Sequence, residues 1–169
     1  MATADLTAAR LRELLHYDQE TGILRYAVAR WGRQHVVVGS VAGTNDGQGY
    51  RKHMIDGRPY KAHRLAWLYT HGVWPAGEVD HINGQRSDNR MSNLRDVPRV
   101  TNSENFRIAR RSNKTGLLGV TSPGKQDKRY TATITAGGKR KTLGRFDTPE
   151  EAHAAYLEAK RQLHAGCTL

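Results

Sequence analysis

Apolar residues recur at helical spacing in two stretches of the first 75 residues. The first stretch covers about residues 5–18 and follows a possible N-cap at Asp5 or Thr7. The second runs from residue 62 to about residue 71, where Gly72 breaks the pattern. Both patterns predict short amphipathic helices.

Strand-like segments surround the second of these helices. Apolar or alternating stretches at 23–28, 36–41 and 50–55 are separated by glycines and followed by the turn signal Asp56-Gly57. They predict a small antiparallel sheet in the N-terminal part of the chain.

The last 55 residues predict three strands followed by one helix. Alternating stretches at 117–121, 129–135 and 139–146 predict three strands joined by glycine-containing turns. Thr148-Pro149-Glu150-Glu151 then forms a capping box with proline at the first helical position, so a helix is expected to follow.

The distribution of charge along the chain indicates a class of binding partner. The chain of 169 residues carries a formal net charge of +11, and residues 107–145 hold eleven Lys and Arg against one Asp. This concentration favours binding to nucleic acid, because neutralising phosphates releases condensed counterions. The alternative is a solvated basic face that serves solubility.

The sequence lacks a long apolar segment and has too few cysteines for a disulfide or a zinc-thiolate site. The sequence has no run of about 18 apolar residues, so a membrane-spanning helix is not expected. Its one cysteine, Cys167, permits no intrachain disulfide and no thiolate cluster for zinc. We therefore expect a reducing, intracellular setting.

Residues 79–105 are rich in Asp, Asn, Gly and Arg, and here we expect the chemistry. Asp80 and His81 are adjacent in an extended segment, so their side chains leave on opposite faces. This arrangement suits a division of labour, in which Asp80 binds a divalent cation and neutral His81 acts as a general base.

Two asparagines extend this hypothesis. Asn93 can tie the intervening loop through its side-chain amide. Thr101-x-x-Glu104 predicts a second capping box, which places Asn102 in the first turn of a helix, where its amide oxygen could complete a metal site.

Three other interpretations of this segment are an EF-hand, a zinc site and a polar loop without chemistry. If Asp80 is counted as position 1, Met91 stands at position 12, where an EF-hand requires glutamate. The histidines form no ligand pair of known spacing for zinc. A polar, asparagine-rich loop without chemistry remains the alternative on the residues alone.

Several separated blocks between about Tyr50 and Asn105 resemble the HNH endonucleases of the ββα-metal type found among phage homing nucleases. The blocks agree with that family in order and spacing. They are His63-Arg64-Leu65-Ala66-Trp67, Asp80-His81-Ile82-Asn83-Gly84, Asp88-Asn89-Arg90, Asn93-Leu94-Arg95, Asn102 and Asn105.

The resemblance implies roles for single residues. Asp80 and Asn102 would bind one divalent ion, Mg²⁺ or Mn²⁺, and His81 would be the general base. Asn93 would fix the loop. His63 and Arg64 belong to the recurrent block as supporting residues, and Asn105 is the alternative to Asn102 as ligand.

The segment from about 115 to 166 resembles the Apetala/ethylene-response-factor DNA-binding domain, through its Leu143-Gly144-Arg145-Phe146 block and the helix that follows. The resemblance implies a sheet that docks on DNA. The predicted DNA-binding residues come from the linker and from the sheet face opposite the helix: Arg107, Arg110, Arg111, Lys114, Lys128, Arg129, Thr131, Thr133, Thr135, Arg140 and Thr142.

Together these patterns predict an α+β protein, in which a ββα-metal HNH module precedes a three-stranded antiparallel sheet packed on one helix. The expected parts are an N-terminal helix and small β region (1–49), the nuclease domain (50–106), a basic linker (107–115) and the DNA-binding domain (116–169).

We expect a metal-dependent endonuclease acting on double-stranded DNA. A homing-type enzyme of phage origin would work in the cytoplasm of the infected or lysogenic bacterium, as a monomer or weak dimer and without membrane contact. The alternative from another class is a non-catalytic DNA-binding regulator with a structural HNH fold. An RNA-binding module is a third possibility, although the paired exposed aromatics of a single-strand platform are missing.

Overall fold

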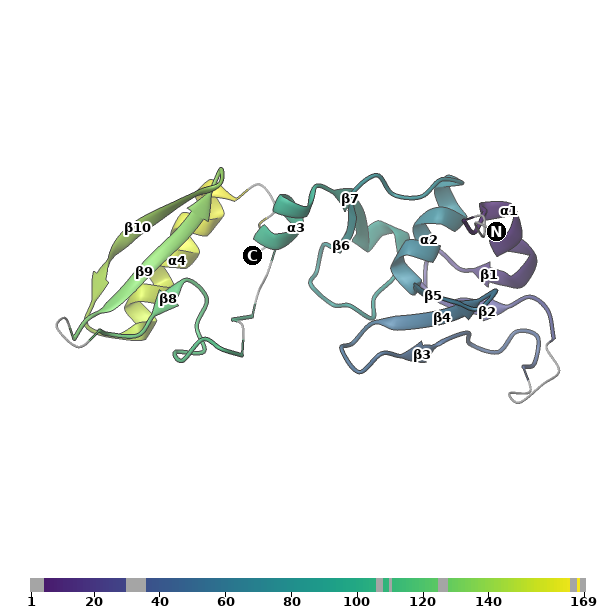
Figure 1. Ribbon diagram of the computed structural model, residues 1–169, viewed down its shortest axis with the longest axis horizontal. Coiled ribbons are helices and arrows are strands. Elements are labelled where there is room, and N and C mark those ends of the chain that lie inside the picture. The colour runs from purple at the N-terminus through teal and green to yellow at the C-terminus, as the bar shows by residue number, and fades with distance from the viewer. Residues whose placement is uncertain are drawn as a thin grey trace. The chain divides into compact units, whose positions relative to one another are not determined.

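The chain folds into two compact units, Met1–Arg99 and Val100–Leu169, which are described separately (Figure 1). This computed structural model describes residues 5–29, 36–105, 108–109, 111–124, 128–164 and 167. Helices and antiparallel sheets occur in both units, which confirms the predicted mixed α and β class.

The first unit begins with helix α1 (Ala8–Leu14), which Thr7 caps by accepting a hydrogen bond from the Arg10 backbone N–H. The prediction that this helix extends to about residue 18 is wrong. Strand β1 (Leu15–Tyr17) follows directly and pairs antiparallel with β2 (Leu24–Tyr26). Leucine at 15 and tyrosine at 17 are buried while the residue between them is exposed, so two-residue periodicity prevails there.

A second sheet has the order β3-β4-β5, formed by β3 (Thr44–Asn45), β4 (Arg51–Ile55) and β5 (Arg58–Lys61). The predicted strand at 36–41 is not formed: Val36 and Val41 are single bridge residues, and Val41 pairs with Arg25 of β2. Exposed valines at 37 and 38 show that its apolar residues do not enter the core.

Helix α2 (Ala62–His71) follows β5 and ends at Gly72, which has a φ of 77° and closes the last turn, as the sequence predicts. The helix buries Leu65 and Leu68 against Leu11 of α1 and Leu24 of β2 in one apolar core. Burying a leucine side chain contributes about 2 kcal/mol, so this core fixes α2 against the N-terminal elements.

Strands β6 (Glu78–His81) and β7 (Leu94–Val97) form an antiparallel pair at the end of the first unit, with the 3₁₀ helix η1 (Met91–Asn93) between them. Helix α3 (Arg99–Glu104) comes next. It starts directly after Pro98, so Thr101 lies inside the helix and the predicted N-cap at Thr101 is wrong. Proline has a fixed φ suited to a helix start, which places the beginning earlier than the capping pattern suggests.

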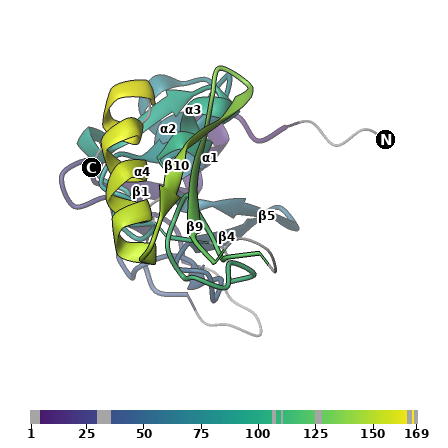
Figure 2. The same cartoon turned by 90° about the vertical axis from the view of Figure 1, so that its left-hand side faces the viewer.

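The second unit has a sheet of order β10-β9-β8 that packs on one helix, as predicted. Its elements are β8 (Val120–Thr121), β9 (Tyr130–Ala136), β10 (Lys139–Phe146) and α4 (Pro149–Leu163). Figure 2 shows α4 lying along one face of this sheet. The capping box of Thr148 and Glu151 is formed.

Alternation in β9 separates the two faces of this sheet. Ala132 and Ile134 are buried, whereas Thr131, Thr133 and Thr135, which alternate with them, lie on the opposite face. Gly119, at a φ of 74°, lies so close to the Tyr156 ring of α4 that a Cβ there would be 2.0 Å from a ring carbon. Any side chain at this position would separate β8 from the helix.

None of the helices in the described part of the chain has the length and apolar content needed to cross a membrane.

Candidate functional site

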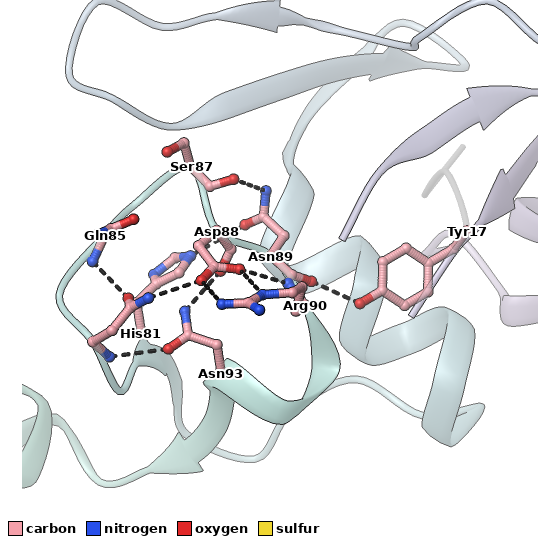
Figure 3. Close-up of polar contacts among 9 residues, drawn as sticks. Tyr17, His81, Gln85, Ser87, Asp88, Asn89, Arg90 and Asn93 are labelled. Atoms are coloured by element: carbon pink, nitrogen blue, oxygen red, sulfur yellow. Dashed lines mark hydrogen bonds and ion pairs between the residues drawn. The ribbon is translucent and has the colours of Figure 1, made fainter. Parts of the chain in front are cut away.

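The β6–β7 pair carries the central residues of the predicted site. Asp80 stands opposite Arg95 and His81 stands opposite Leu94 in the antiparallel register. Asp80 and His81 are both buried. Residues 82–93, which we call the 82–93 loop, connect the two strands and fold back over His81 (Figure 3).

The His81 imidazole contacts an asparagine of this loop. Its Nε2 lies 3.1 Å from Oδ1 of Asn89. The amide of Asn89 is oriented by its own Nδ2, which donates to the carbonyl of Ser87 at 3.3 Å. Since an amide oxygen only accepts, Nε2 carries the proton and the lone pair of the neutral ring is on Nδ1.

Two further rings surround His81. The His63 ring lies edge-on at 5.1 Å between centroids, and the Tyr50 ring lies at 6.0 Å. Burial lowers the pKa of His81, and this effect is opposed by the hydrogen bond to Asn89. Burial and the neighbouring His81 lower the pKa of His63 to about 3. His63 is therefore neutral at pH 7, and the lowered pKa favours neutral His81.

Asn93 joins the two ends of the 82–93 loop. Its Oδ1 accepts a hydrogen bond from the backbone N–H of Asn83 at 3.0 Å, and its Nδ2 donates to the carbonyl of Asp88 at 2.8 Å. The backbone N–H of Ile82 donates to the carbonyl of Asn93 at 2.9 Å. One side chain thus connects the first and last parts of the loop.

Asp88 is the second tie within the loop. Its carboxylate accepts hydrogen bonds from the side chain of Asn83 at 2.8 Å and from the guanidinium of Arg90 at 2.7 and 2.8 Å. The bond from Arg90 is the main reason that the pKa of Asp88 is lowered to about 2. Asp88 is therefore ionised at neutral pH and orders the loop rather than serving as an acid.

Residues distant in sequence contact the 82–93 loop and support it. The hydroxyl of Tyr17 donates to the carbonyl of Asn89 at 2.6 Å, and burial raises the pKa of this tyrosine to about 12. Gly22, at a φ of 72°, packs so closely that a Cβ would be 2.4 Å from the backbone nitrogen of Arg90. The β1–β2 hairpin therefore presses on the segment that holds Asn89.

Asp80 faces a cation of the protein itself. Its Oδ2 accepts hydrogen bonds from Nε and one terminal nitrogen of Arg95 at 3.0 and 2.8 Å. Asp80 and Arg95 are opposite each other in the β6–β7 register, and the Asp80 side chain is only 8% exposed. Arg95 thus compensates the buried negative charge of the predicted metal ligand.

The predicted supporting residues differ in their surroundings. His63 lies against His81, and its Nδ1 has no hydrogen-bond partner within the described part of the chain. The guanidinium of Arg64 instead lies over the Trp74 ring at 5.6 Å and donates to the carbonyl of Gly77 at 3.5 Å. Arg64 thus supports the segment after α2.

Asn102 and Asn105 belong to the second unit and are described within it. Asn102 is half-buried in α3, and its carbonyl accepts a hydrogen bond from the backbone N–H of Asn105 at 3.1 Å. Asn105 is buried. His63, Asp80, His81 and Asn93 all belong to the first unit.

No cluster of three or more His, Cys, Asp or Glu able to hold a metal ion occurs among the residues that the structure describes. The predicted donors, a carboxylate and an amide oxygen, are hard ligands of the kind that Mg²⁺ and Mn²⁺ prefer. The donor chemistry therefore fits such an ion, with Arg95 sharing the Asp80 carboxylate.

The predicted DNA-binding residues of the sheet lie together on one face. Arg140 stands opposite Thr135, and Thr142 stands opposite Thr133, so these four side chains are cross-strand neighbours. The face also includes Thr131, while Lys128 and Arg129 are exposed just before β9. Arg111 and Lys114 are exposed ahead of β8, whereas Arg107 and Arg110 lie outside the described residues.

Four residues that contact the site were missed by sequence reasoning. Asn89 and Arg95 were each named only as part of a block. Tyr17 and Tyr50 carried no signal, because their partners are distant in sequence. Only the Asp-Asn-Arg block offered a hint, since an asparagine beside turn residues can also bind a side chain.

Comparison with known proteins adds one finding. Residues 60–105 match a family described as HNH endonuclease. The matched range runs from β5 to the end of α3 and includes Asp80, His81 and Asn93, so it supports a nuclease enzyme with DNA as the implied substrate. No curated protein and no solved structure matches the chain.

Proposed function

We propose that this protein is a metal-dependent DNA endonuclease that hydrolyses phosphodiester bonds, with His81 as the general base. The observation that carries the proposal is the oriented imidazole. His81 is buried, its lowered pKa favours the neutral form, and Asn89 fixes its tautomer beside Asp80. The match of residues 60–105 to HNH endonucleases supports the same reaction.

The chemistry follows from the tautomer. Nδ1 of His81 accepts a proton from water while the water oxygen forms a bond to phosphorus. The bond between phosphorus and the 3′ oxygen breaks, that oxygen takes up a proton from solvent water, and His81 returns the proton that it accepted to the solvent. The products are a 5′ phosphate and a 3′ hydroxyl.

Asp80 and Asn102 are the residues that we propose to hold the metal ion. When bound, a divalent cation stabilises negative charge on the phosphoryl oxygens and on the leaving oxygen. Asp80 supplies the carboxylate, and Arg95 orients it through two hydrogen bonds to Oδ2. Asn93 and Asp88 keep the 82–93 loop closed around His81.

The second unit is proposed to bind double-stranded DNA through the face that carries Arg140, Thr133 and Thr135. A two-faced sheet with one face covered by α4 presents the other to phosphates and base edges. The homing type and a phage origin are further parts of the proposal that rest on the resemblance of the sequence blocks. A monomer or weak dimer is expected.

Conversion of supercoiled plasmid tests the reaction. Purified protein with Mg²⁺ or Mn²⁺ is expected to produce nicked or linear DNA whose ends carry 5′ phosphate, and EDTA should stop the conversion. Binding of DNA without any conversion, on plasmid and on a library of candidate sites, would instead favour a DNA-binding regulator.

A further inference from the structure

Tyr50 sits at the edge of the site in a tightly held turn. Its backbone N–H donates to Oδ1 of Asp46 at 3.1 Å, and the backbone N–H of Asp46 donates to the carbonyl of Tyr50 at 2.9 Å. The half-buried ring lies 5.3 Å from the His63 ring and 6.0 Å from the His81 ring, between centroids. Tyr50 therefore has a fixed position next to the proposed base.

Two cations from different elements converge on this ring. Nζ of Lys61, at the end of β5, lies 3.9 Å from the ring centroid. The guanidinium carbon of Arg86, in the 82–93 loop, lies 5.0 Å from the same centroid. One terminal nitrogen of Arg86 also donates to the carbonyl of Gln48 at 2.9 Å. Cation–π contacts and this hydrogen bond hold both charges near His81.

The protein does not neutralise these two charges. Within the described part of the chain, neither Lys61 nor Arg86 forms an ion pair, and both are exposed. The carboxylate of Asp46 interacts electrostatically with Lys61. Its Oδ1, however, accepts the backbone N–H groups of Gln48 and Tyr50. Two exposed cations held on the ring of Tyr50, which itself lies beside His81, form a site for an anion.

We propose that Lys61 and Arg86 form a clamp for the phosphates of the DNA strand that is cut, with Tyr50 as the spacer between them. The inference rests on the proposed nuclease function. Phosphate is the ligand that fits, because an ammonium and a guanidinium both donate several charge-assisted hydrogen bonds and accept none. Their contacts would place the reacting phosphorus at the His81 imidazole.

The test compares charge-removing with charge-retaining variants of the full chain. Lys61→Gln and Arg86→Gln remove the charges, and Lys61→Arg and Arg86→Lys retain them. Arg25→Gln is the matched control, because exposed Arg25 also donates to one loop carbonyl, that of Gly39 at 3.0 Å. Single-turnover nicking of plasmid and salt-dependent binding of a short duplex in EDTA are measured for each protein.

We expect each Gln variant to nick about tenfold more slowly, since a charge-assisted contact near the reacting group is lost. Each should also reduce the slope of log K against log salt by about one. Arg25→Gln and the charge-retaining variants should stay within about threefold of the unaltered protein in rate.

Two results would overturn the clamp. One is equal nicking and equal salt slopes for the Gln variants and the Arg25→Gln control. The other is equal damage in the charge-retaining and Gln variants, which would show that the side chains only pack Tyr50. If the unaltered protein does not nick, the proposed function fails, and unchanged salt slopes would then separately reject the clamp.

Discussion

Asn89 fixes the proton of His81 on Nε2, through an amide oxygen 3.1 Å away whose orientation is set by the hydrogen bond to Ser87. The asparagine is itself buried, and its backbone carbonyl accepts the Tyr17 hydroxyl. A base that must use Nδ1 needs this arrangement, because the other tautomer would carry the proton on Nδ1 and leave no lone pair there to accept a proton from water.

Replacing Asn89 with alanine should therefore reduce catalysis more than binding. We expect Asn89→Ala to lower the nicking rate about 10–10²-fold, the usual cost of losing a group that orients a catalytic one. Gel shifts in EDTA should be unchanged. Asn45→Ala is the matched control, because Asn45 only caps an exposed turn by accepting the Gly47 N–H. Equal rates for the two variants would remove Asn89 from the mechanism.

The Tyr17 hydroxyl is expected to stabilise the loop. Tyr17→Phe should lower the free energy of unfolding by about 1 kcal/mol, because the buried carbonyl of Asn89 loses its donor. Tryptophan fluorescence in urea reads this out, since all three tryptophans precede residue 75 and report on the first unit. Tyr69→Phe removes the hydroxyl from the ring packed against Tyr17 and should have almost no effect. A Tyr17→Phe protein as stable as this control would contradict the anchoring role.

Elements with explicit end signals were predictable from the sequence. Helix α2 ends at its glycine, and α4 begins at its capping box, because each signal acts locally. Strand β1 was missed because Leu14 and Leu15 fit both a helical and an alternating pattern. Pairing with β2 decides between them, and pairing depends on residues farther along the chain.

The site likewise contains features that the sequence indicates and contacts that it does not. The adjacency of Asp80 and His81 and the loop position of Asn93 could be interpreted from spacing alone. The contact of Asn89 with His81 requires the 82–93 loop to fold back, and the bond from Tyr17 spans 72 positions. Neither has a signature in local sequence. The pairing of Arg95 with Asp80 depends on strand register, which the sequence did not specify.

Two buried histidines should make the first unit sensitive to acid. Burial lowers the pKa of His53 to about 4 and, with the nearby His81, that of His63 to about 3. Between these values and pH 6.5 the unfolded chain binds more protons than the folded chain, so the free energy of unfolding falls as pH falls. From pH 7 to pH 5 we expect a loss of about 2 kcal/mol for each histidine.

Urea unfolding followed by tryptophan fluorescence at pH 7 and pH 5 measures this loss. His53→Leu should remove the contribution of His53 and leave that of His63, because the His53 ring nitrogens have no hydrogen-bond partner among the residues that the structure describes. Equal unfolding free energies of the unaltered protein at the two pH values would show that these histidines are not buried as described.

The sheet face of the second unit should contribute affinity for DNA. Arg140→Gln is expected to weaken binding of a short duplex and to reduce the salt slope by about one, as for a phosphate contact. Arg161→Gln removes an equal charge from α4, where Arg161 pairs with Glu158, and should leave binding nearly unchanged. If both variants bind alike, this face of the sheet does not contact DNA.

Removal of the His81 imidazole is the most direct test of the account. His81→Ala and the unaltered protein are compared on supercoiled plasmid with Mg²⁺ or Mn²⁺, beside an EDTA control and a gel shift in EDTA. The account predicts metal-dependent nicking that falls about 10²–10⁴-fold in His81→Ala while binding of DNA persists. Nicking by His81→Ala at the rate of the unaltered protein would contradict the assignment of His81 as the base.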